Sequence, residues 1–194
     1  EKIIFPFGVD VVWKAEDQRL NPYTTLPYTS IATTIFKQEK PQIVLIGATS
    51  FGRDLAPRIA SALKTGLTAD CTALEIGDHE DKKLNKIYKN LLYQIRPAFG
   101  GNIIATIINP DHKPQMATVR EGVMKKEIFD PNYQGIVKTI NVNDILKPED
   151  FIVKVLERHI EPSKVNIKNA SIIVAGGYGM GSKENFNMLF ELAD

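Results

Sequence analysis

The sequence predicts an α/β fold, a doubly wound sheet of mainly parallel strands with added antiparallel strands. In its first third, short apolar runs alternate with longer segments whose apolar residues recur at helical spacing. Between residues 88 and 142, by contrast, short strand-like runs follow one another without a helical segment between them. The first pattern is typical of parallel strands joined by helices, and the second accounts for the added strands.

The elements expected before residue 78 follow from apolar runs and from the residues that end them. IVLIG at 43–47 is apolar throughout, as a parallel strand buried on both faces requires. Pro41 ends the helix before this run, and Gly66 ends the helix after it. In order, we expect a strand at 8–15, a helix at 26–40, a strand at 43–47, a helix at 52–65 and a strand at 71–77.

The charged stretch DHEDKKLNK at 78–86 is expected to be a solvated loop or hairpin tip. Strand-like runs then follow at 88–95, 102–108, 115–121 and 135–142. The run at 150–159 could be a strand or a helix, and its branched residues favour a strand. SIIVAGG at 171–177 restarts the parallel pattern, and a helix is expected at 182–194.

One strand and one helix cannot bury their own apolar faces. We therefore expect two domains. Residues 1–170 would form an N-terminal α/β domain, and residues 171–194 would begin a second domain whose remainder is absent.

Composition excludes several classes of function. The net charge of +1 gives no basic surface for nucleic acid or an anionic membrane, and no apolar run is long enough to cross a bilayer. Cys71 is the only cysteine, so an internal disulfide and a cysteine-based metal site are both excluded. We expect a cytoplasmic protein with no metal ligands.

The stretch GATSFGRD follows the apolar strand and resembles a phosphate-binding loop. Gly47 and Gly52 have the required separation, but Arg53 and Asp54 stand where that loop needs Lys and Ser or Thr. Asp54 would repel phosphate, whereas an acidic residue is favourable at the start of a helix. The stretch is better interpreted as a structural strand-to-helix turn.

Three other segments are locally unusual. In TGLTADCTALEI, Thr68, Asp70 and Cys71 precede a strand, and Cys71 lacks an adjacent histidine and is interpreted as a small buried residue. In AGGYGMGS, Gly177, Gly179 and Gly181 lie between a strand and a helix, but Gly181 comes one position too early for the third glycine of the dinucleotide-binding pattern.

The third unusual segment, QIRPAFGGN, places an arginine, a proline, an aromatic residue and two glycines in one irregular turn. Such a turn allows the backbone to approach a ligand or partner closely. Arg96 could hold a phosphate or the carbonyl edge of a flavin, or form an internal ion pair, and the residues alone leave these alternatives open.

Together, four strings resemble the α subunit of electron transfer flavoproteins. They are IVLIGATSFGRDLAPRIASALKTGLTADCTALEI, RPAFGGNIIATI, PQMATVRE and IIVAGGYGMGSKENF. RPAFGGN and PQMATVR are most similar to the branch that performs NADH-dependent, flavin-based electron bifurcation.

The resemblance implies a Rossmann-like, adenine-nucleotide-hydrolase-like first domain, which would lack its first strand in residues 1–170. It also implies a C-terminal FAD domain that opens at residue 171. It implies two FAD molecules, one held mainly by the β subunit and one held mainly by residues beyond 194. It further implies that the GATSFGRD turn is a scaffold element.

The resemblance also supplies cofactor-binding residues. The arginine of RPAFGG and the glutamine before MATVR map onto Arg96 and Gln115, which would reach the ring of the β-subunit FAD. The rest of that turn supplies Phe99, Gly100 and Gly101. Tyr178 stands where the family has an arginine near the other FAD, so that contact departs from the family pattern.

The function implied is that of an electron-carrier subunit without catalytic residues of its own. Electrons from NADH would pass to ferredoxin or flavodoxin and to an acyl-CoA or 2-hydroxy-acid dehydrogenase, through a heterodimer with the β subunit. The alternatives are a non-bifurcating α subunit and a stand-alone adenine-nucleotide-binding module.

Overall fold

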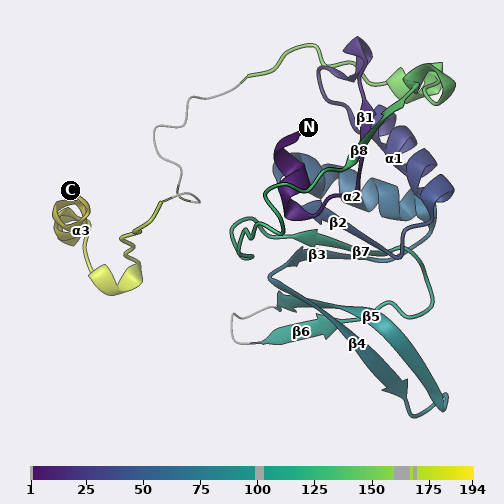
Figure 1. Cartoon of the computed structure of the whole chain (residues 1–194). Coiled ribbons are helices and arrows are strands. Elements are labelled where there is room, and N and C mark those ends of the chain that lie inside the picture. Colours follow the sequence, from purple (N-terminus) through teal and green to yellow (C-terminus); the bar gives the residue numbers. More distant parts are fainter. Residues whose placement is uncertain (1, 99–102, 160–166, 168–169) are drawn as a thin grey trace. The chain divides into compact units, whose positions relative to one another are not determined.

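The computed structural model describes residues 2–98, 103–159, 167 and 170–194. The chain divides into two compact units, residues 1–155 and 156–194 (Figure 1). The second unit begins before residue 170, where we expected the domain boundary. That boundary stays a prediction.

The first unit alternates helices and strands in its first half and is rich in strands thereafter. Its elements are η1 (Lys2–Phe7), β1 (Val11–Ala15), η2 (Gln18–Leu20), α1 (Thr25–Glu39), β2 (Ile43–Gly47), α2 (Ser50–Leu63), β3 (Leu67–Cys71), β4 (Ala73–Asp81), β5 (Lys86–Pro97), β6 (Ile104–Ile107), β7 (Gln115–Val119), β8 (Ile136–Ile140), η3 (Val142–Asp144) and η4 (Pro148–Phe151).

The strands of this unit form three sheets. β2, β7 and β3 make a parallel sheet with β7 in the middle, and β1 and β8 make a separate parallel pair. β4, β5 and β6 make an antiparallel sheet. Parallel strands joined by helices, with added antiparallel strands, confirm the predicted α/β fold class, although the parallel strands are divided between two sheets.

Helix α1 contributes to the cores on both sides of it. Its buried Ile31 packs with Leu20 and Val142, which lie beside the β1–β8 pair. One turn further on, Phe36 packs against the cluster that includes Ile59 of α2 and Met116 of β7. The helix therefore connects the two parallel sheets through apolar contact.

The expected strand at 71–77 is two strands. β3 ends at Cys71 and belongs to the parallel sheet, and β4 begins at Ala73 in the antiparallel sheet. The pairing of β3 with β7 shifts between Thr68 and Cys71, and Asp70 has a left-handed backbone with φ of 64°. This irregularity turns the chain out of one sheet and into the other.

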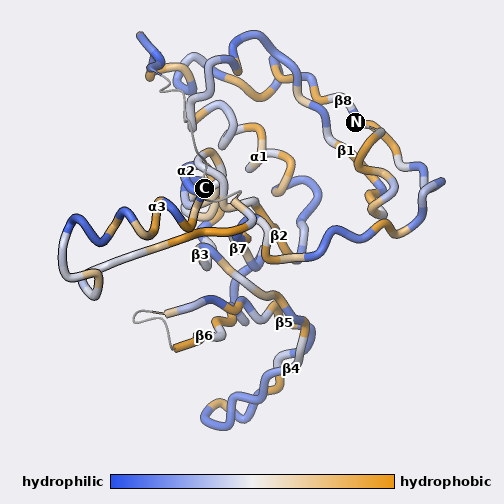
Figure 2. The backbone as a smooth tube through the Cα atoms, turned by 90° about the vertical axis from the view of Figure 1, so that its left-hand side faces the viewer, coloured by the Kyte–Doolittle hydropathy of each residue, from blue (hydrophilic) through white to orange (hydrophobic). Residues whose placement is uncertain are grey.

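The antiparallel sheet packs against the parallel sheet on the side away from α2 (Figure 1), with Leu92 of β5 in a cluster with Cys71 and Ala117. Its β4–β5 hairpin is hydrophilic at the far end, whereas β6 is hydrophobic (Figure 2). The hairpin tip predicted at 78–86 is shorter than expected, because β4 continues to Asp81 and β5 begins at Lys86.

The prediction of a strand at 150–159 was wrong. Lys147 and Asp150 cap the short helix η4, and residues 152–159 then continue without strand pairing. Apolar side chains there are exposed, Leu156 at 90%. Branched residues favour a strand only where a neighbouring strand offers hydrogen bonds and a surface to pack on, and the described residues offer none to this segment.

In the second unit the described residues contain η6 (Tyr178–Met180), η7 (Glu184–Phe186) and α3 (Asn187–Ala193). The helix predicted at 182–194 is confirmed in its second half. The strand predicted at 171–177 is not formed, and Ile172 and Ile173 are exposed. Among the residues described, no helix is both long and apolar enough to span a bilayer.

Candidate functional site

The carboxyl ends of β2, β7 and β3 lie level with one another. Val119, the last residue of β7, is paired with Gly47 at the end of β2 on one side and with Cys71 at the end of β3 on the other. In open α/β sheets, ligands bind outside this edge of the sheet. Three charged side chains lie at or just beyond these strand ends, and we call them the carboxyl-edge cluster: Arg53 in the first turn of α2, Asp70 next to the end of β3, and Arg120 directly after β7.

The turn from β2 into α2 places Arg53 in this cluster. Thr49 caps α2, and its hydroxyl accepts a hydrogen bond from the Gly52 N–H at 3.0 Å. Gly52 packs so tightly against β2 that a Cβ would lie 1.9 Å from the Gly47 carbonyl oxygen. The glycine is needed for close strand–helix packing, which supports the interpretation of GATSFGRD as a structural turn.

Arg53 and Arg120 converge on one carboxylate. Arg120 donates from Nη2 and Nε to the two Asp70 oxygens, at 2.7 and 3.2 Å. Arg53 donates from Nη2 to Asp70 Oδ1 at 3.1 Å and from Nε to the Ala48 carbonyl oxygen at 2.8 Å. The cluster thus holds two positive charges and one negative charge at the sheet edge.

The charges around Asp70 lower the pKa of its carboxyl group. The hydrogen bond from Arg120 is the largest cause, partial burial opposes it, and the charges of Arg120, Arg53 and Arg96 add to the lowering. Asp70 is therefore ionised at neutral pH. The guanidinium groups remain accessible, since the Arg53 and Arg120 side chains are 54% and 44% exposed.

Arg96, the first of the predicted flavin contacts, lies near this cluster. It stands at the end of β5, which contacts β3, and its charge reaches both Asp70 and Cys71. Its Nε makes one long hydrogen bond of 3.4 Å to the Pro97 carbonyl oxygen. Within the described part of the chain Arg96 forms no ion pair, so its charge is not neutralised by a bonded carboxylate there.

Gln115, the second predicted contact, begins β7 and is 2% exposed. Its Oε1 accepts a hydrogen bond from the Leu92 N–H at 2.8 Å. Gln115 thus joins the central parallel strand to the antiparallel sheet. It lies at the amino end of β7, whereas the carboxyl-edge cluster lies at the other end of the sheet, so the structure does not bring Gln115 and the cluster together.

The other predicted site residues are not assembled with these. Phe99, Gly100 and Gly101 lie outside the described residues. Tyr178 belongs to the second unit, where it begins η6 and is fully exposed. Its proposed proximity to a cofactor therefore stays a prediction.

Arg120 and the role of Asp70 were missed by sequence reasoning. Asp70 was noted only as part of an unusual segment, and Arg53 only as a departure from the phosphate-binding pattern. The available signal was positional for two of the three residues, because Arg53 follows the strand predicted at 43–47 and Arg120 lies near the end of the run predicted at 115–121. Asp70 gave no such signal, since it precedes the strand predicted at 71–77. What the sequence does not specify is that the three strand ends are level.

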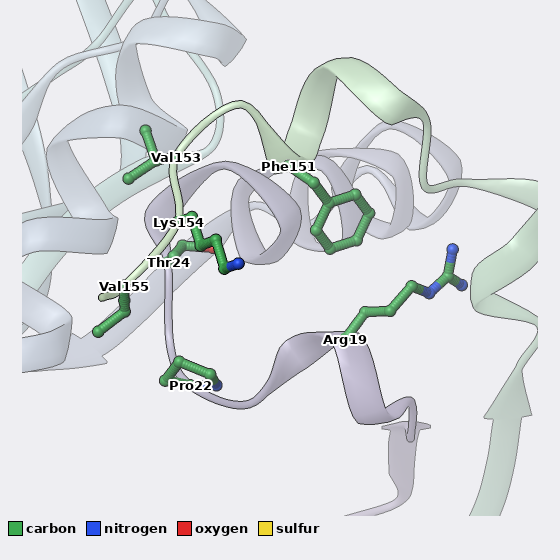
Figure 3. A pocket seen from close by; sticks show the side chains of 7 residues that line it. All are labelled: Arg19, Pro22, Thr24, Phe151, Val153, Lys154 and Val155. Atoms are coloured by element: carbon green, nitrogen blue, oxygen red, sulfur yellow. The ribbon is translucent and has the colours of Figure 1, made fainter. Parts of the chain in front are cut away.

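A separate open groove of about 410 Å³ lies beside the start of α1 (Figure 3). The Arg19 guanidinium at its rim is already held by Asp17 and Asn143, and lies 5.5 Å from the centre of the Phe151 ring. The groove is otherwise mainly apolar, and besides the paired Arg19 the only other charged side chain among its described lining residues is that of Lys154. Its lining residues are Arg19, Pro22, Thr24, Phe151, Val153, Lys154 and Val155.

The chemistry available at the carboxyl-edge cluster is that of anion and carbonyl recognition. Guanidinium groups donate several hydrogen bonds and stay charged at every physiological pH. No group of three or more His, Cys, Asp or Glu residues that could hold a metal ion occurs in the described part of the chain. The cluster is therefore suited to bind or stabilise a negatively charged group.

Comparison with known families identifies the chain. The electron transfer flavoprotein domain matches residues 2–145, which include the whole carboxyl-edge cluster. The chain belongs to the electron transfer flavoprotein family.

Three individual proteins illustrate what this electron transfer flavoprotein domain is similar to. The electron transfer flavoprotein subunit alpha of Thermoanaerobacterium thermosaccharolyticum is 45% identical over 194 residues, covering 100% of this chain and 55% of the relative. The acryloyl-CoA reductase electron transfer subunit beta of Anaerotignum propionicum is 38% identical over 188 residues, covering 90% of this chain and 51% of the relative.

A third relative is the LctC subunit of the lactate dehydrogenase (NAD(+),ferredoxin) of Acetobacterium woodii. It is 33% identical over 202 residues, covering 98% of this chain and 43% of the relative. The chain spans about half the length of the curated relatives it matches.

Proposed function

We propose that this chain acts within the α subunit of an electron transfer flavoprotein and presents its carboxyl edge to an FAD held mainly by a β subunit. The observation that carries the proposal is the pair of accessible arginines at that edge, with Arg96 beside them. Family membership and similarity to named α subunits supply the cofactor class.

The residues at the edge suit one part of a flavin, the ring edge that carries carbonyl oxygens and gains negative charge on reduction. Fixed positive charge near this edge favours the anionic reduced form and so raises the reduction potential. Bound there, FAD would supply the electron-accepting chemistry, and the chain would supply charge and hydrogen-bond donors. Arg96 is proposed as one donor.

Gln115 is proposed to support the flavin site only indirectly, because it is 2% exposed at the amino end of β7 and its carbonyl oxygen is already bonded to the Leu92 N–H. Phe99, Gly100 and Gly101 are proposed to shape the approach of the ring. Tyr178 is proposed to lie near a second FAD, where its uncharged ring would stabilise a pyrophosphate or a reduced flavin less than an arginine does.

Electron bifurcation is the specific activity we propose. Electrons from NADH would divide between ferredoxin or flavodoxin and an acyl-CoA or 2-hydroxy-acid dehydrogenase. In support, one relative is named for acryloyl-CoA reductase, and another for a lactate dehydrogenase whose name includes NAD(+) and ferredoxin.

Co-expression of the α subunit that contains this chain with its β subunit tests the proposal. We expect a yellow heterodimer that contains FAD, is reduced by NADH and passes electrons to ferredoxin only when a dehydrogenase acceptor is present. NADH oxidation without ferredoxin reduction would indicate a non-bifurcating α subunit. A colourless protein that binds ATP without a partner would contradict the flavoprotein assignment.

A further inference from the structure

We propose that Asp70 is a positioning residue, which holds the Arg53 and Arg120 guanidiniums in fixed orientations toward the anionic ring edge of the partner subunit's flavin. The inference rests on the proposed function, because it concerns the same sheet edge. It gives a role to the TADC segment, whose aspartate the proposed function leaves without one.

The contacts show how firmly Arg120 is oriented. Its Nε and Nη2 donate to different oxygens of the Asp70 carboxylate, so the two planar groups form a fork with two parallel hydrogen bonds. The Arg120 backbone N–H also donates to the Cys71 carbonyl oxygen at 2.9 Å. Both ends of Arg120 are therefore fastened to the end of β3.

Arg53 is oriented by the same carboxylate. One of its nitrogens is bonded to Asp70 and another to the Ala48 carbonyl oxygen at the end of β2. Asp70 thus lies between the two arginines and reduces the repulsion between their charges. Each guanidinium has five N–H donors, so both keep free donors for a ligand.

The backbone of Asp70 is itself held in place. Its φ of 64° is in the left-handed region, which Asp and Asn adopt more readily than other residues with a side chain. Its N–H donates at 2.8 Å to the hydroxyl of Thr118, which is 1% exposed in the central strand β7. The local conformation therefore carries the carboxylate at a fixed point beside β7.

Positioning and simple charge make opposite predictions for Asp70→Asn. If Asp70 acts only as a charge, its removal leaves more positive charge near the flavin and raises the reduction potential. If Asp70 positions the arginines, its removal lets both side chains move away from the ring and lowers the potential. Asparagine tolerates the left-handed backbone, so the turn is preserved in the variant.

Arg120→Lys provides a second test, in which the charge of the side chain is unchanged. Lysine keeps the positive charge but cannot form the fork with Asp70. The positioning role predicts a lower flavin potential for this variant too, whereas a purely electrostatic role predicts no change. Asp17→Asn is the matched control, because Asp17 forms the same kind of fork with Arg19, at 2.7 and 2.8 Å, away from the sheet edge.

The experiment uses the purified heterodimer with bound FAD, and the potential of the flavin is measured by spectroelectrochemical titration. For both Asp70→Asn and Arg120→Lys we expect a roughly tenfold shift toward the oxidised flavin, which is a decrease of about 59 mV for a one-electron couple. Asp17→Asn should leave the potential unchanged.

A second readout does not depend on the flavin. In NMR spectra of the chain, the Arg120 Nε–H signal should be sharp and well dispersed in the wild type, and exchange-broadened in Asp70→Asn.

The outcomes separate the two claims. An increased potential in Asp70→Asn together with an unchanged potential in Arg120→Lys would overturn the positioning role. If Arg53→Ala and Arg120→Ala shift the potential while Asp70→Asn does not, the positioning role fails and the proposed function stands. If none of these variants changes the flavin potential, the proposed flavin contact at this edge is itself wrong.

Discussion

At the scale of single residues, burial separates the side chains that can meet a cofactor from those that hold the fold. Arg53 and Arg120 are accessible and keep free N–H donors, whereas Gln115 is buried and bonds to the backbone of β5. Substitutions of the two kinds should therefore have different consequences, on flavin potential in one case and on stability in the other.

Arg96→Ala should lower the flavin potential of the heterodimer and disable bifurcation while sparing the fold. A hydrogen bond to a charged group contributes roughly 1.5–3 kcal/mol. A tenfold change, about 1.4 kcal/mol, corresponds to about 59 mV for a one-electron couple. The expected decrease is thus roughly 60–130 mV, measured together with NADH-driven ferredoxin reduction, flavin content and melting temperature. Wild-type bifurcation at an unshifted potential would remove Arg96 from the site.

Gln115→Leu should destabilise the chain, because it leaves the buried Leu92 N–H without its acceptor. An unsatisfied buried donor costs about 1–3 kcal/mol. Urea denaturation of the wild type and the variant measures the difference. Stability equal to that of the wild type would show that the bond between β7 and β5 contributes nothing.

At the scale of elements, the turn from β2 to α2 depends on a single glycine. Gly52→Ala should destabilise the fold by about 1–3 kcal/mol or more, as overpacking does, because the new Cβ would overlap the Gly47 carbonyl oxygen. Gly47→Ala is the control in the same turn, since its Cβ would meet only the Thr49 methyl group at 3.7 Å. Thermal denaturation should show a large decrease in melting temperature for the first variant and a small one for the second.

The loop before α1 is joined to α2 by a hydrogen bond that titrates. The Tyr23 hydroxyl donates to Asp54 Oδ2 at 2.7 Å, and burial together with this bond raises the Tyr23 pKa from 10.0 to about 12. Because the pKa is raised in the folded chain, the bond stabilises fully below pH 10, and its contribution is lost as the pH rises through about 12.

Ultraviolet titration of the tyrosines measures this pKa. The wild type should contain one more late-ionising tyrosine than Tyr23→Phe, and Asp54→Asn should shift that ionisation to lower pH. Ionisation of Tyr23 near pH 10 in the wild type would show that the bond to α2 is not formed.

Elements that carry a complete local signal were predictable from the sequence. The apolar run at 43–47 matches β2, and the helix expected at 26–40 corresponds to α1 at 25–39. The end of α2 was less predictable: Gly66 was expected to stop the helix, but Lys64 adopts the left-handed cap. The apolar segment at 152–159 shows the limit, because strand formation depends on a partner that local sequence does not reveal.

The candidate site could be predicted only in part for a related reason. Arg96 was identified from its unusual turn and the family resemblance, and it lies near the cluster. Arg120 and Asp70 acquire a common role only when β3 and β7 are paired, and that pairing brings together residues 50 positions apart in the chain. The spacing of residues along the sequence does not reveal which distant residues come into contact.

At the scale of the first unit, one helix and one strand connect its parts. α1 packs against both parallel sheets, and β7 is central to the larger sheet and bonded through Gln115 to the antiparallel sheet. This connected core fixes the level at which β2, β3 and β7 end. The accessible arginines are thereby carried on a rigid edge, which is how a protein holds charge at a set distance from a cofactor.

The most direct test of this account is a structure of the heterodimer with FAD bound, in which the distances from the flavin ring to Arg53, Arg96 and Arg120 are measured. We predict that the ring edge of the β-subunit flavin faces the carboxyl ends of β2, β3 and β7, with at least one of these guanidiniums at a hydrogen-bonding distance of about 3 Å. A flavin ring far from all three arginines, with the carboxyl-edge cluster open to solvent, would contradict the account.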